Sequence, residues 1–306
     1  MTDLSVGSEP DVDGFWKRPL QQWIDLYIRT HKYLRSRPDF GSVQISGPST
    51  SGPPTPSFEW WTSWLSAIAE NDAIPDQYSF HLLYGARDQV DLRYAVPTLR
   101  QLLQQYGLPE RVINANEYAI PEEQVPSAST WFLSRFDRYD VPGLRANWLS
   151  RCQLHDFMGN LVSKTGAPSA STCNGQGYFP NGEYQLYKYF NLNMTGYRAS
   201  TEGSGDGLAD AYTTIGSDKV RTIAGVRLAT GTWLLTFNNL SSVGLPTAGQ
   251  LPVQTWAFTF NGLWGRVDAP QDRGVYTHTY SGNSVSFEIR VPAADQPVAF
   301  AFEFGI

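Results

Sequence analysis

The sequence predicts an α/β domain followed by an all-β domain: a partial (β/α)8 TIM-type barrel of about five strands, then a C-terminal antiparallel β-sandwich. In the first part, short apolar runs alternate with helical patterns, and beyond Gly196 the hydrophobic period changes to two. Alternation of strands with helices indicates parallel strands joined by crossover helices. Short alternating strands between turn residues are typical of a sandwich. We therefore expect a barrel domain over residues 1–196 and a sandwich domain over residues 197–306.

Five short apolar or β-branched runs are the expected parallel strands. They lie near Leu4, Val43, Tyr78, Val112 and Leu144. Helical patterns fall between them, and the clearest has its apolar residues in steps of four, three, four and three: Leu92, Val96, Leu99, Leu103 and Tyr106. This spacing places one apolar face toward the interior. A further helical pattern runs from Glu183 to Asn193, before the expected domain boundary.

The second domain is predicted from strict alternation along the chain. Val285, Phe287, Ile289 and Val291 are separated by polar residues, and the C-terminal segment from Val298 to Phe304 follows the same pattern. A period of two gives each strand one apolar face. Such strands need a second sheet to cover that face, which favours a sandwich.

Composition excludes several classes of function. The chain has 306 residues, a net charge of −6 and a pI near 5.2, without the clustered Lys and Arg of a nucleic-acid surface. No apolar run approaches the roughly 18 residues of a membrane helix. We expect no nucleic-acid partner and no membrane partner. The segment Met1-Thr2-Asp3-Leu4 has no readable secretory signal. The localisation is therefore open, and a secreted parent enzyme is one plausible source of the chain.

Metal and disulfide chemistry have little support in the sequence. The four histidines, His31, His81, His155 and His278, are scattered without ligand spacing, so we expect neither a metal nor another cofactor. Two cysteines, Cys152 and Cys173, lie in a Gly- and Ser-rich region that would permit a disulfide. Their pairing is an expectation that geometry must test.

Two carboxylates stand at the ends of expected strands. The run Val112-Ile113-Asn114-Ala115-Asn116 stops at Glu117, and Glu9 follows the first expected strand in the same way. In α/β folds the ligand site lies at the carboxyl ends of the strands. Two carboxylates in such places are the minimal equipment for glycoside hydrolysis. The ten tryptophans fit this reading, because sugar C–H faces stack on aromatic rings, although most will pack in the core.

Short motifs then resemble those of the clan A glycoside hydrolases, and of family 39 in particular, in the fungal style. Four segments carry the resemblance: Ser8-Glu9-Pro10-Asp11, Gly47-Pro48-Ser49, Ser79-Phe80-His81 with Tyr84, and Asn116-Glu117-Tyr118. They are similar, in order, to the Asn-Glu-Pro signature ending the fourth barrel strand, the Gly-Gly-Pro turn of the fifth, the Ser-x-His-x-Tyr segment of the sixth, and the nucleophile segment of the seventh. A β-sandwich after the barrel also matches the family.

The resemblance implies roles for individual residues. Glu9 matches the general acid/base and Glu117 the nucleophile of a retaining mechanism. The implied substrate-binding residues are Ser8, Trp16, His81, Tyr84, Tyr118 and Trp148. The implied activity is that of a retaining exo-glycosidase acting on β-xyloside-like or related glycosides, with a carbohydrate as partner.

Two departures from the family leave alternatives open. Ser8 replaces the family's Asn, whereas Asn116 precedes Glu117, so the two carboxylate roles could be exchanged; strand order favours Glu117 as nucleophile. A complete barrel has eight strands in about 250 residues, and we count five. We therefore expect an open, curved sheet whose first and last strands do not pair, and a chain that aggregates or stays inert alone. The alternative function is a non-catalytic carbohydrate-binding or interaction protein with a degenerate glycosidase fold.

Overall fold

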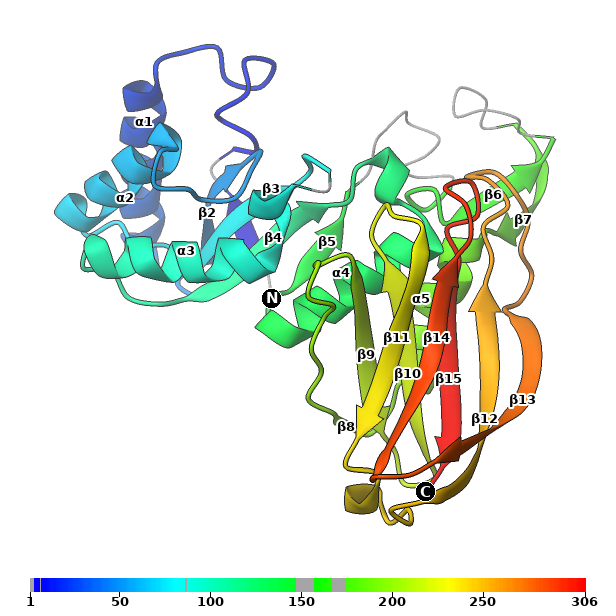
Figure 1. Ribbon diagram of the computed structural model, residues 1–306. Coiled ribbons are helices and arrows are strands. Elements are labelled where there is room, and N and C mark those ends of the chain that lie inside the picture. The colour runs from blue at the N-terminus through cyan, green and yellow to red at the C-terminus, as the bar shows by residue number, and fades with distance from the viewer. Residues whose placement is uncertain (1–2, 6, 86, 147–156, 167–173) are drawn as a thin grey trace. The chain divides into compact units, whose positions relative to one another are not determined.

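The computed structural model describes residues 3–5, 7–85, 87–146, 157–166 and 174–306 (Figure 1). The chain divides into two compact units. The first comprises Met1–Ile120 and Phe136–Ala146, and the second comprises Pro121–Arg135 and Asn147–Ile306. The domain boundary expected near residue 196 stays a prediction, and the second unit includes segments that precede that position.

The first unit is built on a five-stranded parallel sheet with strand order β1-β2-β3-β4-β5. Its strands are β1 (Asp3–Ser5), β2 (Gln44–Thr50), β3 (Gln77–Leu82), β4 (Val112–Tyr118) and β5 (Gly143–Arg145). The five expected parallel strands are confirmed. Among the described residues β1 and β5 form the two edges and do not pair with each other, as expected for a partial barrel.

Three amphipathic helices connect these strands and cover one face of the sheet. They are α1 (Leu20–Arg35), α2 (Glu59–Asn71) and α3 (Leu92–Gln105), with short 3₁₀ turns η1 (Pro38–Phe40) and η2 (Asp88–Val90). The covered face is aromatic: Trp61 packs edge-on against Phe80, and Trp64 against Tyr78. Burial of such large side chains drives the packing of helices on the sheet.

Gly47 lets β2 approach that aromatic layer. A Cβ atom there would lie 2.9 Å from Tyr27 Cε2 and 3.2 Å from Trp64 Cζ2. Since both rings are fully buried, they have little freedom to move aside. The glycine of the Gly47-Pro48-Ser49 motif is therefore explained by packing on the helix side of the sheet.

The second unit contains a β-sandwich. A six-stranded sheet has the order β13-β12-β15-β10-β9-β8, and β11 pairs with β14 in a second sheet. The six strands are β8 (Tyr197–Arg198), β9 (Ala209–Ile215), β10 (Lys219–Val226), β12 (Gly249–Phe258), β13 (Gln271–Tyr280) and β15 (Ala299–Gly305). The second sheet consists of β11 (Gly231–Asn238) and β14 (Ser284–Val291), and a 3₁₀ turn, η5 (Leu240–Val243), follows β11. Val285, Phe287, Ile289 and Val291 of β14 pack in the same core as residues of β10, β12 and β15, so the predicted alternation and sandwich are confirmed.

Helices cover the other face of the six-stranded sheet. They are α5 (Gly182–Asn193) and the first part of α4 (Pro126–Tyr139), and Leu186 and Tyr189 share a second core with residues of β10, β12 and β15. A Cβ atom at Gly225 would lie 2.2 Å from the Ser127 carbonyl oxygen, so only glycine admits α4 this close to β10. The helix expected over Glu183–Asn193 is thus present and packs on the sandwich.

Smaller elements complete the second unit. They are η3 (Pro121–Glu123) and an antiparallel pair, β6 (Val162–Thr165) with β7 (Gln176–Pro180). Across the described ranges, no helix has both the length and the apolar character that crossing a membrane would require.

Candidate active site

Glu9 lies in the loop that follows β1, and backbone contacts fix its position. Its main chain has φ 48°, in the left-handed region, and its N–H donates to the Ser49 carbonyl at 2.8 Å. Two residues on, the Asp11 carboxylate accepts hydrogen bonds from the backbone N–H of Ser51, at 2.9 Å, and from the Ser51 hydroxyl. The loop is therefore attached at two points to the end of β2. This attachment holds the Glu9 side chain over the carboxyl end of the sheet.

His81 and Glu117 come from the two central strands β3 and β4. The pairing of these strands is irregular: Phe80 is opposite Ala115, but His81 is opposite Glu117, which leaves Asn116 as an extra residue. An extra residue of this kind changes the alternation of side chains. As a result Asn116 and Glu117 both reach the inner face, since Asn116 contacts Ser49 and Glu117 lies beside His81.

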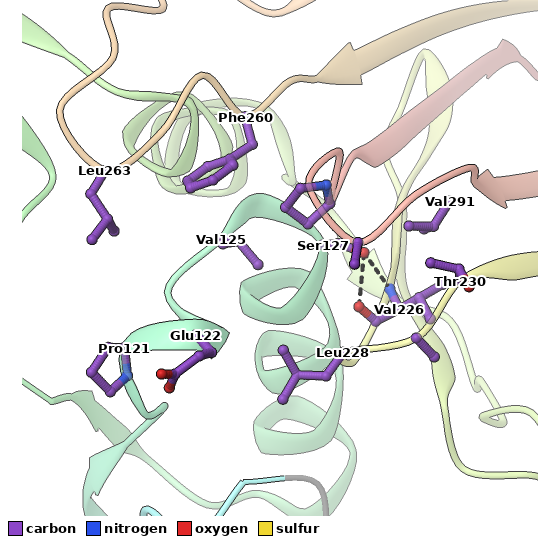
Figure 2. A pocket seen from close by; sticks show the side chains of 13 residues that line it. Pro121, Glu122, Val125, Ser127, Val226, Leu228, Thr230, Phe260, Leu263 and Val291 are labelled. Atoms are coloured by element: carbon purple, nitrogen blue, oxygen red, sulfur yellow. Dashed lines mark hydrogen bonds between the residues drawn. The ribbon is translucent and has the colours of Figure 1, made fainter.

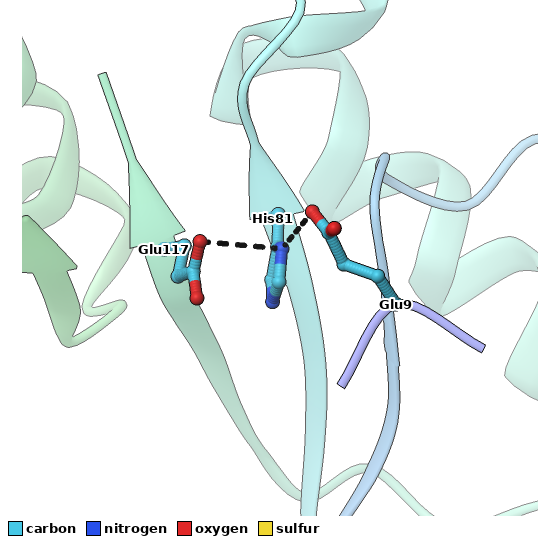
Figure 3. A group of neighbouring side chains, drawn as sticks. All are labelled: Glu9, His81 and Glu117. Atoms are coloured by element: carbon cyan, nitrogen blue, oxygen red, sulfur yellow. Dashed lines mark hydrogen bonds and ion pairs between the residues drawn. The ribbon is translucent and has the colours of Figure 1, made fainter. Parts of the chain in front are cut away.

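The three side chains converge at one end of the sheet (Figure 3). His81 Nδ1 lies 2.9 Å from Glu9 Oε1 and 3.8 Å from Glu117 Oε2. One carboxylate oxygen from each Glu and this nitrogen all lie within 4.8 Å of one another. His81 is fully buried, whereas the side chains of Glu9 and Glu117 are 15% and 40% exposed. Both carboxyl groups can therefore be reached by a ligand, and the imidazole between them cannot.

Glu9 and His81 are joined by a hydrogen bond of 2.9 Å. The donor is the ring N–H when Glu9 is ionised and the carboxyl O–H when Glu9 is protonated. The other ring nitrogen, Nε2, is buried and has no hydrogen-bond partner among the described residues. Because a buried unpaired donor is costly, the proton belongs on the Nδ1 side, between His81 and Glu9.

The environment of Glu117 disfavours its charge. Burial raises the pKa of this carboxyl above its ordinary value of 4.5, the neighbouring His81 lowers it, and the negative charge of Glu9 raises it again, with a net upward shift. Partial removal from water and a like charge both act against the ionised form. Perturbed titration of this kind is common at functional sites.

Polar side chains continue below the carboxylates along the inner face. Gln77 bridges Gln44 at 2.7 Å and Asn114 at 3.1 Å. Nearer the carboxylates, the Ser49 hydroxyl contacts Ser79 at 2.8 Å. The sheet is thus apolar toward its helices and polar toward the site.

The other residues expected to bind substrate lie in different places. Tyr84 is half-exposed, and its hydroxyl lies 2.6 Å from Ser51 Oγ, beside the Glu9 loop. Ser8 is exposed next to Glu9, and Trp16 is half-buried with its Nε1 donating to the Pro19 carbonyl at 3.5 Å. Tyr118 differs from the expectation: it is buried against Phe136, with ring centroids 4.6 Å apart, so its ring does not line the site. Consecutive strand residues point to opposite faces, which explains why Tyr118 leaves the site that Glu117 enters.

Three expected residues lie outside the described part of the chain: Trp148, Cys152 and Cys173. Conversely, the sequence reasoning assigned no role to Ser49, Ser51 or Asp11, which hold the site together. Asp11 could have been found, since it belongs to the quoted Ser8-Glu9-Pro10-Asp11 motif. Ser49 also belongs to a quoted motif, Gly47-Pro48-Ser49, but its role depends on an irregular strand register that one sequence alone does not locate.

Glu9, His81 and Glu117 could also ligate a divalent cation. They offer two carboxylate oxygens and one imidazole nitrogen within 4.8 Å, a donor set that suits several first-row metals. Glu9 would have to give up its hydrogen bond with Nδ1, because that nitrogen would become the ligand.

A largely apolar pocket lies in the second unit (Figure 2). It has a volume of about 420 Å³, and Val125, Leu228, Phe260 and Leu263 are among the side chains that line it. The Ser127 hydroxyl is already used, since it donates to the Val226 carbonyl and accepts from the Val226 N–H, both at 2.8 Å. Sugar recognition needs convergent polar groups. This pocket is therefore a poor carbohydrate site compared with the polar strand ends of the first unit.

Several solved structures, glycoside hydrolases among them, share this architecture. The structure of N2152 from Neocallimastix frontalis matches 98% of the chain at 21% identity, with a TM-score of 0.77. A family 44 xyloglucanase from Paenibacillus polymyxa matches 100% at 13% identity (TM-score 0.63), and a glucosidase from Croceicoccus marinus matches 99% at 12% identity (TM-score 0.58). The chain spans 69%, 66% and 68% of these three proteins, respectively.

At these identities the likeness shows the fold alone, a partial barrel followed by a β-sandwich. No protein-family model matches the sequence, and comparison with curated proteins gives no match either. Membership of family 39 therefore stays a prediction.

Proposed function

We propose that this chain carries the active site of a retaining exo-glycoside hydrolase that acts on β-xyloside-like or related glycosides. The observation that carries the proposal is the convergence of Glu9 and Glu117 on His81 at the carboxyl end of the parallel strands. Retaining glycosidases hold their two carboxyl groups about 5–5.5 Å apart, and inverting ones about 6.5–9.5 Å apart. Oxygen atoms within 4.8 Å fit the retaining geometry.

The proposed mechanism is a double displacement. In the first step the Glu117 carboxylate attacks the anomeric carbon, while Glu9 donates its proton to the leaving glycosidic oxygen. The sugar is then bonded to Glu117, and the aglycone departs as an alcohol. In the second step ionised Glu9 takes a proton from water, whose oxygen attacks the anomeric carbon and releases Glu117 as a carboxylate.

The site supports this division of roles in two ways. The hydrogen bond of 2.9 Å between His81 and Glu9 fixes the orientation of the Glu9 carboxyl group beside the site. Glu117 lies 3.8 Å from the same nitrogen and is the more exposed of the two carboxylates, so a sugar can approach it. Since the pKa of Glu117 is raised, we expect its ionisation to set the acidic limb of the pH–rate profile above pH 4.5.

A panel of aryl glycosides tests the activity. Proton NMR of the first-formed sugar should show the anomeric configuration of the substrate. Glu9→Gln and Glu117→Gln should each lower turnover by at least about 10²–10⁴-fold. Glu110→Gln is the matched control, because Glu110 is an exposed carboxylate of the same unit, paired with Arg100 on the surface. Release of the inverted sugar, or full turnover by both site variants, would overturn the proposal.

Azide rescue tests which carboxylate is the nucleophile. With Glu117→Gly, azide should attack the substrate directly and give a glycosyl azide of inverted configuration. With Glu9→Gly, azide should attack the covalent intermediate and give the retained configuration. The opposite pair of products would exchange the two roles, as Asn116 before Glu117 suggested from the sequence.

A non-catalytic carbohydrate-binding function is the second candidate. It is favoured by the position of Glu9, which follows β1, an edge strand of the five-stranded sheet. Calorimetry with xylo-oligosaccharides separates the two: saturable binding that Glu9→Gln weakens, together with intact ligand after prolonged incubation, would select the binding function.

A further inference from the structure

We propose that Ser49 is the positioning residue that fixes the separation between the Glu9 and Glu117 carboxyl groups. This inference rests on the proposed function, because it assigns the support for that catalytic pair. Ser49 is completely buried at the end of β2, between the loop that carries Glu9 and the strand that carries Glu117. It touches no part of the open site, so it acts only through its neighbours.

On one side, Ser49 holds the Glu9 loop. Its carbonyl oxygen accepts the Glu9 N–H at 2.8 Å, which fixes the backbone from which that carboxylate extends. Its hydroxyl also lies 2.9 Å from Ser5 Oγ, in the strand that leads into the loop.

On the other side, the same hydroxyl reaches the strand of Glu117. It accepts a hydrogen bond of 3.2 Å from Asn116 Nδ2, and Asn116 is the extra residue that precedes Glu117 in β4. Asn116 Oδ1 is buried and has no hydrogen-bond partner among the described residues. The hydrogen bond to Ser49 therefore anchors the Asn116 side chain. It thereby also holds the bulged part of β4 that directs the Glu117 side chain to the inner face of the sheet.

The hydroxyl is also tied to the strand of His81. Ser49 Oγ and Ser79 Oγ are 2.8 Å apart, and Ser79 precedes His81 by two residues on the same face of β3. One side chain thus contacts the supports of all three site residues. A network of this kind holds functional groups in place because each member limits the movement of the others.

The backbone conformation of Ser49 allows the contribution of its hydroxyl to be tested separately from that of its main chain. Its φ is 58°, a left-handed conformation that is uncommon outside glycine and asparagine. Glycine would adopt this conformation more easily, yet it would lack the hydroxyl. Ser49→Gly therefore removes the hydrogen bonds of the hydroxyl without straining the main chain, and it keeps the carbonyl that accepts from Glu9 N–H, which makes it a sharper test than Ser49→Ala alone.

We expect both variants to let the carboxyl groups separate. A misplacement of about 1 Å costs on the order of 10²-fold in rate. Both variants should lower kcat by about 10–10²-fold while KM changes less than about twofold, because Ser49 does not touch the substrate. The negative charge of Glu9 raises the pKa of Glu117, so a wider separation should move the acidic limb of the pH–rate profile to lower pH.

The matched control is Thr50→Val. Thr50 is the next residue, is equally buried, and accepts a hydrogen bond of 2.8 Å from Trp61 Nε1 on the helix side of the sheet. Its loss should lower stability to chemical denaturation but leave the pH–rate profile unchanged. A profile shift of the same size in Thr50→Val would show that general loosening of β2, rather than positioning by Ser49, causes the effect.

A second measurement does not require turnover. Carboxyl ¹³C NMR on protein labelled at glutamate Cδ follows the titration of Glu9 and Glu117, with signals assigned by the single Gln variants. In Ser49→Gly the two titrations should become less coupled than in the original chain, while Thr50→Val leaves them coupled. Unchanged titrations in both Ser49 variants would overturn the positioning role. Lack of turnover by the original chain on every glycoside would count against the proposed function only, since the NMR titration would still test Ser49.

Discussion

The surroundings of Glu117 oppose the ionisation of its carboxyl group. This side chain ends a strand whose other face is buried, and it shares the inner face with Glu9 and a fully buried His81. A carboxyl with a raised pKa binds its proton more tightly in the folded chain than in the unfolded chain. Ionisation of Glu117 at neutral pH therefore reduces the stability of the first unit.

The pH dependence of stability tests this consequence. The stabilisation from protonated Glu117 should be complete below the unfolded value of 4.5 and should be lost as the pH rises through the higher folded pKa. Glu117→Gln cannot ionise, so its free energy of unfolding relative to the original chain should increase between pH 4 and pH 7. Urea denaturation at a series of pH values measures the difference. The exposed Glu110→Gln should show no such trend, and a parallel pH dependence for Glu117→Gln and the original chain would contradict the prediction.

The three residues that meet at the candidate site could be singled out from the sequence because their signals are local. Glu9 and Glu117 each end an apolar run, and His81 follows Ser79 within a recognisable strand. The position of Asn116 and the role of Ser49 depend instead on where β2, β3 and β4 depart from regular pairing. A shift of one residue moves a side chain to the other face of a sheet. One sequence alone does not locate such a shift.

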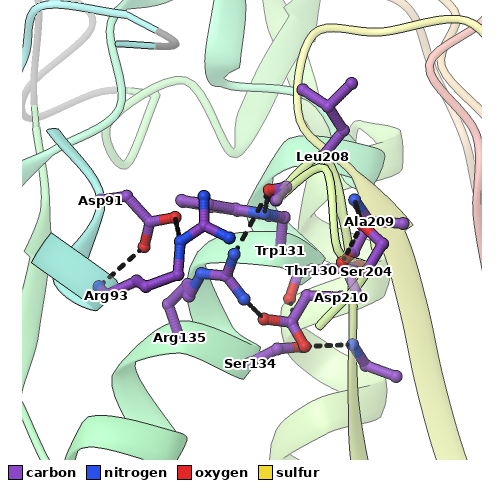
Figure 4. Close-up of polar contacts among 12 residues, drawn as sticks. Asp91, Arg93, Thr130, Trp131, Ser134, Arg135, Ser204, Leu208, Ala209 and Asp210 are labelled. Carbon is purple, nitrogen blue, oxygen red and sulfur yellow. Dashed lines mark hydrogen bonds and ion pairs between the residues drawn. The ribbon is translucent and has the colours of Figure 1, made fainter. Parts of the chain in front are cut away.

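At the scale of elements, one buried ion pair joins helix α4 to strand β9 (Figure 4), and a second joins η3 to the residue that follows β10. The guanidinium groups of Arg135 and Arg227 both contact the Trp131 ring, at 4.6 and 4.5 Å from its centroid. Arg135 pairs with Asp210, and Arg227 pairs with Glu123 at 2.6 Å; all four charged side chains are at most 3% exposed. Each buried cation thus has both a carboxylate and an aromatic face.

Removing one member of such a pair should be costly. Glu123→Gln leaves the Arg227 charge uncompensated in the interior, and we expect it to lower the free energy of unfolding by about 3 kcal/mol. The double variant Glu123→Leu with Arg227→Met should lose less than the sum of the two single changes, because it buries no unpaired charge. Guanidinium denaturation measures all of these variants. Asp268→Asn is the control, since the Arg266–Asp268 pair is exposed and should contribute less than about 1 kcal/mol. Equal effects at the two pairs would contradict the prediction.

The type of each element was largely predictable from the sequence, whereas the elements and side chains that it packs against were not. The periods of α3, α5 and β14 in the sequence predicted the correct type of element for each. The pattern of α5 shows an apolar face but not which sheet covers it, and Leu186 and Tyr189 pack on the sandwich. The buried charges of α4 also escaped prediction, because Arg135 reads as a surface residue until Asp210 is placed beside it.

At the scale of the whole molecule, two features favour self-association. Among the described residues, the parallel sheet has unpaired edges at β1 and β5, and an unpaired edge is a template for another strand. The net charge of −6 supplies repulsion at neutral pH, but it vanishes near the pI of about 5.2.

We expect the chain to associate most strongly near pH 5.2 and through the β5 edge. Leu144 is 66% exposed on this three-residue strand, so Leu144→Glu places a charge directly on the edge and increases the net charge to −7. Light scattering against protein concentration should show less association for this variant than for the original chain. Leu192→Glu is the matched control: it adds the same charge at a similarly exposed leucine, 60% exposed in α5 and away from any strand edge. If Leu192→Glu suppresses association as effectively as Leu144→Glu, net charge rather than the open edge controls it; if neither does, association proceeds through another surface.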